Sequence, residues 1–160
     1  MKESVLILCT KNSCRSQMAE GVLRHYGSDL YEVVSGGNEP TRVNAIAVRV
    51  MREIGIDISW HKAKGIAGFL GQHFDVVITV CDQANEMCPV FPGAGRRFHW
   101  SFQDPPQTEE DAPEILEGFR RVRDEIHARF RQAAEEGFAA FPANQVLTGS
   151  GQDSRAVEGS

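Results

Sequence analysis

The fold is decided by the stretch SVLILCTKNSCRS, residues 4–16. Its first five residues form a short apolar run that is typical of a buried strand. A polar loop follows, and from Ser16 onward a helix is indicated, because apolar residues recur on one helical face: Ala19, Val22, Leu23 and Tyr26. A buried strand that passes through a short polar loop into a helix predicts an α/β fold.

Strands and helices alternate along the rest of the chain. Further strands are predicted over three runs, residues 31–35, 74–80 and 97–100. A second helix is predicted around residues 47–54, and a long third helix begins near a capping-box-like pair, Asp111 and Glu114. The arginines of this helix are most simply its solvated face: Arg120, Arg121, Arg123, Arg129 and Arg131. The alternation predicts a single three-layer α/β domain with a four-stranded parallel sheet flanked by helices.

Length and charge exclude several classes of function. A chain of 160 residues fits one domain with a hydrophobic core, expected here at residues 1–140. The small polar residues near the end predict a flexible tail over residues 141–160. A formal net charge of −5 gives no overall attraction for nucleic acid or membrane, so an anionic substrate must be attracted locally.

The beginning of the chain shows no secretory signal, and no apolar run approaches the length of a membrane span. We therefore expect a cytoplasmic monomer whose four cysteines are thiols rather than structural disulfides.

The strand ends gather the residues that can do chemistry. Cys9 ends the first strand, Cys81 follows the third, and Asp104 follows the fourth. Ligands of open parallel sheets bind beyond the carboxyl ends of the strands, so these side chains are expected at one edge of the sheet.

In the loop between the first strand and the first helix, five residues separate Cys9 from Arg15, a spacing that suits an oxyanion-binding site. Arg15 can bind two oxygens of an anion with its planar guanidinium, and the positive environment favours a Cys9 thiolate, the nucleophilic form. Ser16 is placed to donate a hydrogen bond to that sulfur. The backbone N–H groups of the loop can surround the anion: Thr10, Lys11, Asn12, Ser13 and Cys14. The alternative, a core cysteine and a surface arginine, is disfavoured by the strand before the loop and the helix after it; for Cys14 itself, packing is the simpler role.

Residues 9–21 resemble the signature of thioredoxin-coupled arsenate reductases, a family that shares the low-molecular-weight tyrosine phosphatase fold. The similarity continues to about residue 131, through these segments: residues 56–59, 81–89, 99–100 and 119–126. The resemblance implies a substrate, arsenate, and an external reductant, thioredoxin, with no bound cofactor.

Cys81 and Cys88 flank a short polar segment at the expected edge of the sheet. Taken singly, each is better explained as a structural thiol, and a zinc site does not fit their spacing. The resemblance implies a relay instead. Cys9 attacks arsenate, Cys81 attacks the Cys9 sulfur, and Cys88 attacks Cys81. No metal site is predicted anywhere in the chain.

Asp104 and Pro105 resemble the family's general-acid element, although an aspartate before two prolines also suits a plain turn. Tyrosine phosphatases of this fold carry aromatic residues after this pair, whereas Pro106, Gln107 and Thr108 follow here. That favours a small inorganic oxyanion over phosphotyrosine. A phosphatase that acts on phosphotyrosine or a small phosphoester and a thiol-based sensor remain the alternatives.

Lys11 stands where glycine is common in the family, which leaves the backbone conformation of the loop open.

Overall fold

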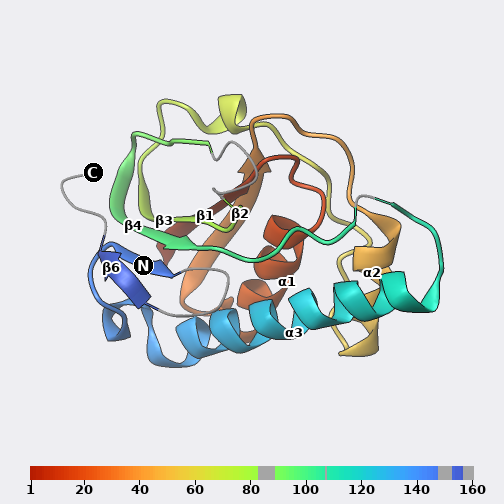
Figure 1. Cartoon of the computed structure of the whole chain (residues 1–160). Helices are drawn as coiled ribbons and strands as arrows, with labels where there is room; N and C mark the ends of the chain where they lie inside the picture. The colour runs from red at the N-terminus through yellow and green to blue at the C-terminus, as the bar shows by residue number, and fades with distance from the viewer. Residues whose placement is uncertain (83–88, 107, 148–152, 157–160) are drawn as a thin grey trace.

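The computed structural model describes residues 1–82, 89–106, 108–147 and 153–156, the last four by their backbone. Four parallel strands lie side by side in its sheet in the order β2-β1-β3-β4, with β2 at one edge. Their bounds are Glu3–Cys9 (β1), Tyr31–Gly37 (β2), Phe74–Thr79 (β3) and Ala94–Trp100 (β4). The α-helices are Arg15–Gly27 (α1), Ala45–Glu53 (α2) and Pro113–Glu136 (α3) (Figure 1).

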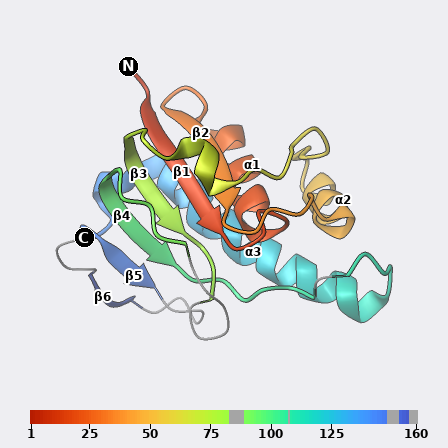
Figure 2. The ribbon, with the colours of Figure 1, turned by 90° about the horizontal axis from the view of Figure 1, so that it is seen from above.

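The two faces of the sheet are covered unequally. The α-helices pack on one face, where they enclose the main hydrophobic core with Val5 and Ile7 of β1 (Figure 2). The alternate β1 residues, Leu6 and Leu8, face a smaller cluster under Phe91 and the 3-10 helix η1 (Ile66–Phe69). This confirms the predicted α/β domain with a parallel sheet. Because side chains alternate along β1, the strand contributes residues to both hydrophobic clusters.

The sheet is wider than predicted. Beyond the 3-10 helix η2 (Phe138–Ala140), β5 (Gln145–Leu147) pairs in parallel with β4, and β6 (Asp153–Ala156) pairs antiparallel with β5. The prediction of four strands was therefore wrong. Both added strands lie in the segment expected to be a flexible tail, and Leu147 is buried in the main core. Strands of three and four residues are too short to show a hydrophobic period.

The start of α3 also differs from its prediction. Its N-cap is Ala112, with no side-chain capping bond, and Asp111 forms an ion pair with Arg49 of α2 at 2.6 Å. The capping box was therefore wrong, because the aspartate is used between two helices rather than within one.

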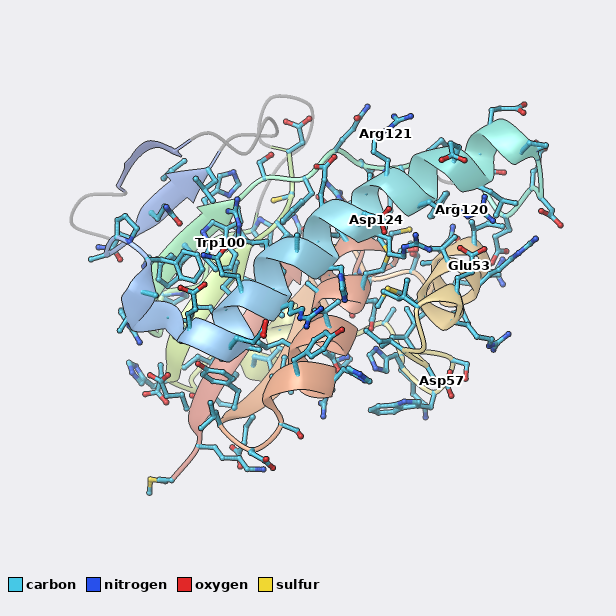
Figure 3. All side chains as sticks on the ribbon, turned by 90° about the horizontal axis from the view of Figure 1, so that it is seen from below. Glu53, Asp57, Trp100, Arg120, Arg121 and Asp124 are labelled. Carbon is cyan, nitrogen blue, oxygen red and sulfur yellow. The ribbon has the colours of Figure 1, made fainter. Side chains whose placement is uncertain are left out.

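One arginine of α3 is not solvated, contrary to expectation. Arg123 is 8% exposed and donates to the Val50 carbonyl at 2.9 Å and to Glu53 at 2.8 Å. Arg120 donates two further bonds to Glu53, and the two side chains lie together where α2 meets α3 (Figure 3). These bonds hold the pKa of Glu53 at about 2, chiefly through Arg120. The ion pairs of Arg120 and Arg123 with Glu53 hold the end of α2 against α3. The other end of α2 adjoins the loop of residues 9–15, because the Asn44 N–H donates to the Ser13 carbonyl.

No helix in the described part of the chain has the length and apolarity needed to cross a bilayer.

Candidate active site

The oxyanion loop, residues 9–15, connects β1 to α1 and is shaped by one residue in the left-handed region. Asn12 has φ 51°, a conformation that asparagine adopts more readily than most residues. Lys11 does not share it, since the non-glycine residues with positive φ in the described ranges are Asn12 and Asn144. The lysine that stands where glycine is common therefore adds a side chain at the pocket without strain in the backbone.

The Asn12 side chain uses both ends of its amide to hold the loop. Its Nδ2 donates to Ser16 Oγ at 2.7 Å and to Ser35 Oγ at 2.9 Å. Its Oδ1 accepts from Gln17 Nε2 and from the Lys64 backbone N–H, both at 2.8 Å. The loop is thus fixed to α1, to β2 and to the segment before η1, with all four bonds made by a side chain buried completely.

The carbonyl groups of the loop are occupied on its outer side. Those of Thr10, Lys11 and Ser13 accept backbone hydrogen bonds from the segment 39–44 at 2.9 to 3.1 Å. In a trans peptide the following N–H points the opposite way. The N–H groups of Lys11, Asn12 and Cys14 therefore point away from that segment and into the loop, as an anion site requires.

Gly37, at the end of β2, makes this loop possible. A Cβ at this position would lie 2.5 Å from the Thr10 carbonyl oxygen and 2.8 Å from that of Cys9. Backbone atoms cannot yield as side-chain ends can, so a larger residue would displace the loop.

A pocket opens over the loop, and it unites residues that are distant in sequence. It is lined by Cys9, Thr10, Lys11, Ser13, Cys14, Arg15 and Asp104. The predicted convergence at the carboxyl ends of the strands is therefore present for Cys9 and Asp104, 95 residues apart. An anion in this pocket would meet a thiol, a guanidinium and inward N–H groups at once.

Cys9 has a hydrogen-bonding environment suited to a thiolate. Its Sγ lies 2.9 Å from Ser16 Oγ. Because Ser16 accepts from Asn12 Nδ2, its own hydrogen is available for the sulfur. A hydrogen bond to the charged form stabilises that form. The predicted partnership of Ser16 and Cys9 is present in the structure.

Arg15 and Asp104 face each other across the pocket. Arg15 is 3% exposed, and its Nη1 donates to the Phe102 carbonyl at 3.3 Å. Its Nη2 lies 3.4 Å from Asp104 Oδ1, whose side chain is 38% exposed. Asp104 therefore sits at the mouth of the pocket, where an acid could reach a departing oxygen.

Cys14 is buried and chemically unlike Cys9. Burial raises its pKa to about 12, and its Sγ donates to Ser13 Oγ at 3.8 Å. A thiol with so high a pKa is almost entirely protonated near neutral pH. Its placement agrees with the packing role expected for it.

Cys81 follows β3 at the same edge of the sheet. Leu8 of β1 pairs with Thr79 of β3, and the Val80 N–H donates to the Leu8 carbonyl at 2.9 Å. Cys81 therefore comes directly after the residue that lies beside the end of β1, where Cys9 stands. Cys81 is fully buried and disulfide-bonded, whereas Cys9 and Cys14 carry thiols. Cys88 and Gln107 lie outside the described residues.

Two further groups of the site were missed by sequence analysis. Gln17 donates to the Asn12 carbonyl and to the Lys62 carbonyl, and its Oε1 lies 2.9 Å from His61 Nδ1. Burial lowers the pKa of His61. No spacing in the sequence links residues 44 positions apart, so only the topology reveals this support.

Among the described residues, no cluster of three His, Cys, Asp or Glu is arranged to hold a metal.

The comparisons with known proteins agree with this geometry. Residues 4–140 match the family model for low molecular weight phosphotyrosine protein phosphatase. The chain belongs to this family. Within it, the chain is similar to enzymes named arsenate reductase. The arsenate reductase of Shouchella clausii is 46% identical over 136 residues, 85% of this chain and 98% of that relative.

Solved structures of this family show the same similarity. An arsenate reductase in the phosphate-binding state is 34% identical, with a TM-score of 0.71 over 85% of this chain and 98% of that chain. A thioredoxin-dependent arsenate reductase of Corynebacterium glutamicum is 25% identical, with a TM-score of 0.63 over 88% of this chain and 64% of that one. The resemblance expected from residues 9–21 is therefore confirmed.

Proposed function

We propose that this enzyme reduces arsenate to arsenite, with Cys9 as nucleophile, Cys81 and Cys88 as a disulfide relay, and thioredoxin as the reductant. The observation that supports the proposal is the pocket lined by Cys9, Arg15 and Asp104, with Cys81 just beyond the end of the adjacent strand β3. The names of the relatives support arsenate as the substrate.

The first step forms a bond between sulfur and arsenic. The Cys9 thiolate, with Ser16 donating to it, attacks the arsenic atom of arsenate held by Arg15 and the loop N–H groups. One arsenate oxygen departs as water, and Asp104 is placed to supply its proton. The product is a covalent Cys9–arsenate intermediate, and arsenic is still pentavalent.

The second step carries the reduction. The Cys81 thiolate attacks the Cys9 sulfur, and the electron pair of the sulfur–arsenic bond passes to arsenic, which leaves as arsenite. The two thiols lose two electrons and become a disulfide. Cys88 then attacks Cys81, which returns Cys9 as a thiolate, and thioredoxin reduces the final disulfide.

A phosphatase is the second candidate, because the family model is that of a phosphotyrosine phosphatase and the pocket would bind phosphate equally well. The segment after Asp104 supports arsenate instead, since Pro105 and Pro106 stand there without an aromatic side chain. A monomeric, cytoplasmic protein stays a prediction.

The test is arsenate-dependent oxidation of NADPH with purified thioredoxin and thioredoxin reductase. We expect turnover with wild type and none with Cys9→Ser, and slower turnover when glutathione and glutaredoxin replace thioredoxin. Hydrolysis of a phosphoester is measured in parallel. If Cys81→Ser hydrolyses the ester at the wild-type rate and wild type shows no arsenate-dependent oxidation of NADPH, the enzyme is a phosphatase.

A further inference from the structure

The chain that carries Asp104 runs from the end of β4 to the start of α3, and it is attached to the rest of the protein before and after this residue. Before Asp104, the Phe102 N–H donates to the Val80 carbonyl at 3.2 Å, and the Phe102 carbonyl accepts from Arg15 Nη1 at 3.3 Å. After Asp104, the chain passes beside α2 before α3 begins (Figure 1).

Asn44, the N-cap of α2, makes the second attachment. Asn44 is 6% exposed, and its Nδ2 donates to the Thr108 carbonyl at 3.0 Å. The next residue, Glu109, accepts from the Ala45 N–H at 2.9 Å and forms an ion pair with Arg42. A carboxylate beside the N-terminus of a helix is favourable. Two consecutive residues are thus held against the first turn of α2.

The orientation of the Asn44 amide is set by its other partners. Its Oδ1 accepts from the Ile46 N–H at 2.8 Å and from the Ala47 N–H at 3.2 Å, which caps α2. Backbone N–H groups only donate and a carbonyl only accepts, so Nδ2 must face the Thr108 carbonyl. The Asn44 backbone N–H donates to the Ser13 carbonyl at 3.0 Å. One residue therefore joins the oxyanion loop to the segment after Asp104.

We propose that Asn44 is a positioning residue for the acid step: its side-chain amide holds the segment after Asp104, and this keeps the Asp104 carboxyl group at the mouth of the oxyanion pocket. Asn44 lies outside the lining of that pocket, so it acts through Asp104. A displacement of about 1 Å at a reacting group can slow a reaction by about 10²-fold, so one hydrogen bond away from the site can change the rate. The inference rests on the proposed function in taking Asp104 as the acid.

The test compares two substitutions that differ in the helix cap. Asn44→Ser and Asn44→Ala both remove the donor to Thr108, and both leave the backbone bond to Ser13. Serine supplies a capping hydroxyl group and alanine does not, so the melting temperature should fall further in Asn44→Ala. The main readout is the rate of arsenite release in a single turnover at saturating arsenate, with all cysteines reduced beforehand.

We expect both variants to release arsenite about five- to twentyfold more slowly than wild type, because a displaced acid loses part of its contribution to the rate. The arsenate concentration that gives half the maximal rate should stay within about twofold of wild type, because the oxyanion loop keeps its bonds. Asn38→Ser, at an exposed asparagine before the same helix, is the control and should react at the wild-type rate. If Asn44→Ser also reacts at the wild-type rate, Asn44 is only a helix cap and the proposal is overturned.

A double-variant cycle tests whether Asn44 acts through Asp104. In an Asp104→Asn background the acid is already lost, so adding Asn44→Ser is expected to change the rate by less than about twofold. An undiminished loss in that background would contradict the proposal.

A last measurement does not depend on the substrate. Amide hydrogen exchange in peptides that cover residues 101–112 is expected to be faster in Asn44→Ser than in wild type and unchanged in Asn38→Ser. Equal exchange in Asn44→Ser and wild type would contradict the role of Asn44, whether or not the enzyme reduces arsenate. A wild-type enzyme that releases no arsenite would contradict the proposed function instead.

Discussion

The two ends of the oxyanion loop carry cysteines of equal burial and opposite chemistry. Cys9 and Cys14 are each 2% exposed. Cys9 Sγ lies 2.9 Å from Ser16 Oγ, which accepts from Asn12 Nδ2 and so has its own hydrogen available for the sulfur. Cys14 has its thiol hydrogen directed at Ser13 at 3.8 Å, and burial raises its pKa to about 12. Burial is the main cause of the raised pKa of Cys14, so what distinguishes Cys9, at the same exposure, is the hydroxyl group that Ser16 presents to its sulfur.

The sharpest form of the comparison is the pH dependence of labelling. With a pKa of about 12, the Cys14 thiolate fraction at pH 8 is about 10⁻⁴, and it rises only as the pH approaches 12. We expect iodoacetamide to modify Cys9 at pH 8 while Cys14 stays unmodified over the same time course, as read by peptide mass spectrometry. Equal labelling of the two thiols would show that Cys9 and Cys14 do not differ in thiolate content at this pH.

Substitution of each cysteine should separate them nearly as strongly. Cys9→Ser removes the nucleophile, so arsenate-dependent NADPH oxidation is expected to fall by about 10³-fold or more. Cys14→Ser keeps a small side chain in the same place and is expected to retain activity within about threefold. If both variants lose activity to the same extent while remaining folded by circular dichroism, Cys14 has a chemical role that its pKa does not suggest.

The Ser16 hydroxyl group is responsible for part of this difference. A hydrogen bond to a charged acceptor contributes about 1.5–3 kcal/mol, so Ser16→Ala is expected to slow Cys9 alkylation and turnover by roughly ten- to a hundredfold. Ser13→Ala, beside Cys14, serves as the control and should change both rates little. An unchanged rate in Ser16→Ala would mean that the loop N–H groups and Arg15 suffice without the hydroxyl.

Much of the fold was predictable because its signals are local. The apolar run before Cys9, the helical period after Ser16 and the strand before Cys81 each lie within a few residues, and parallel-sheet topology then places the strand ends together. Pairing Cys9 with Asp104 followed from that rule alone.

The support of the site was not predictable, because it depends on contacts between distant segments. Asn12 meets Ser35 and Lys64, which are 23 and 52 residues away, and nothing in their spacing marks them. The glycine at position 37 is required by the proximity of a carbonyl that only the folded loop brings there. The predicted capping role of Asp111 at α3 was wrong for the same reason, because Asp111 forms an ion pair with Arg49 of α2 instead.

We propose that Cys81 forms a disulfide with Cys9 and that Cys88 then attacks Cys81, which frees Cys9 as a thiolate. It is tested most directly by one turnover of Cys88→Ser with arsenate, followed by alkylation and a non-reducing peptide map by mass spectrometry. We expect one arsenite per enzyme and a trapped disulfide between Cys9 and Cys81. Multiple turnovers of Cys88→Ser with thioredoxin, or arsenite released without a bond between Cys9 and Cys81, would contradict it.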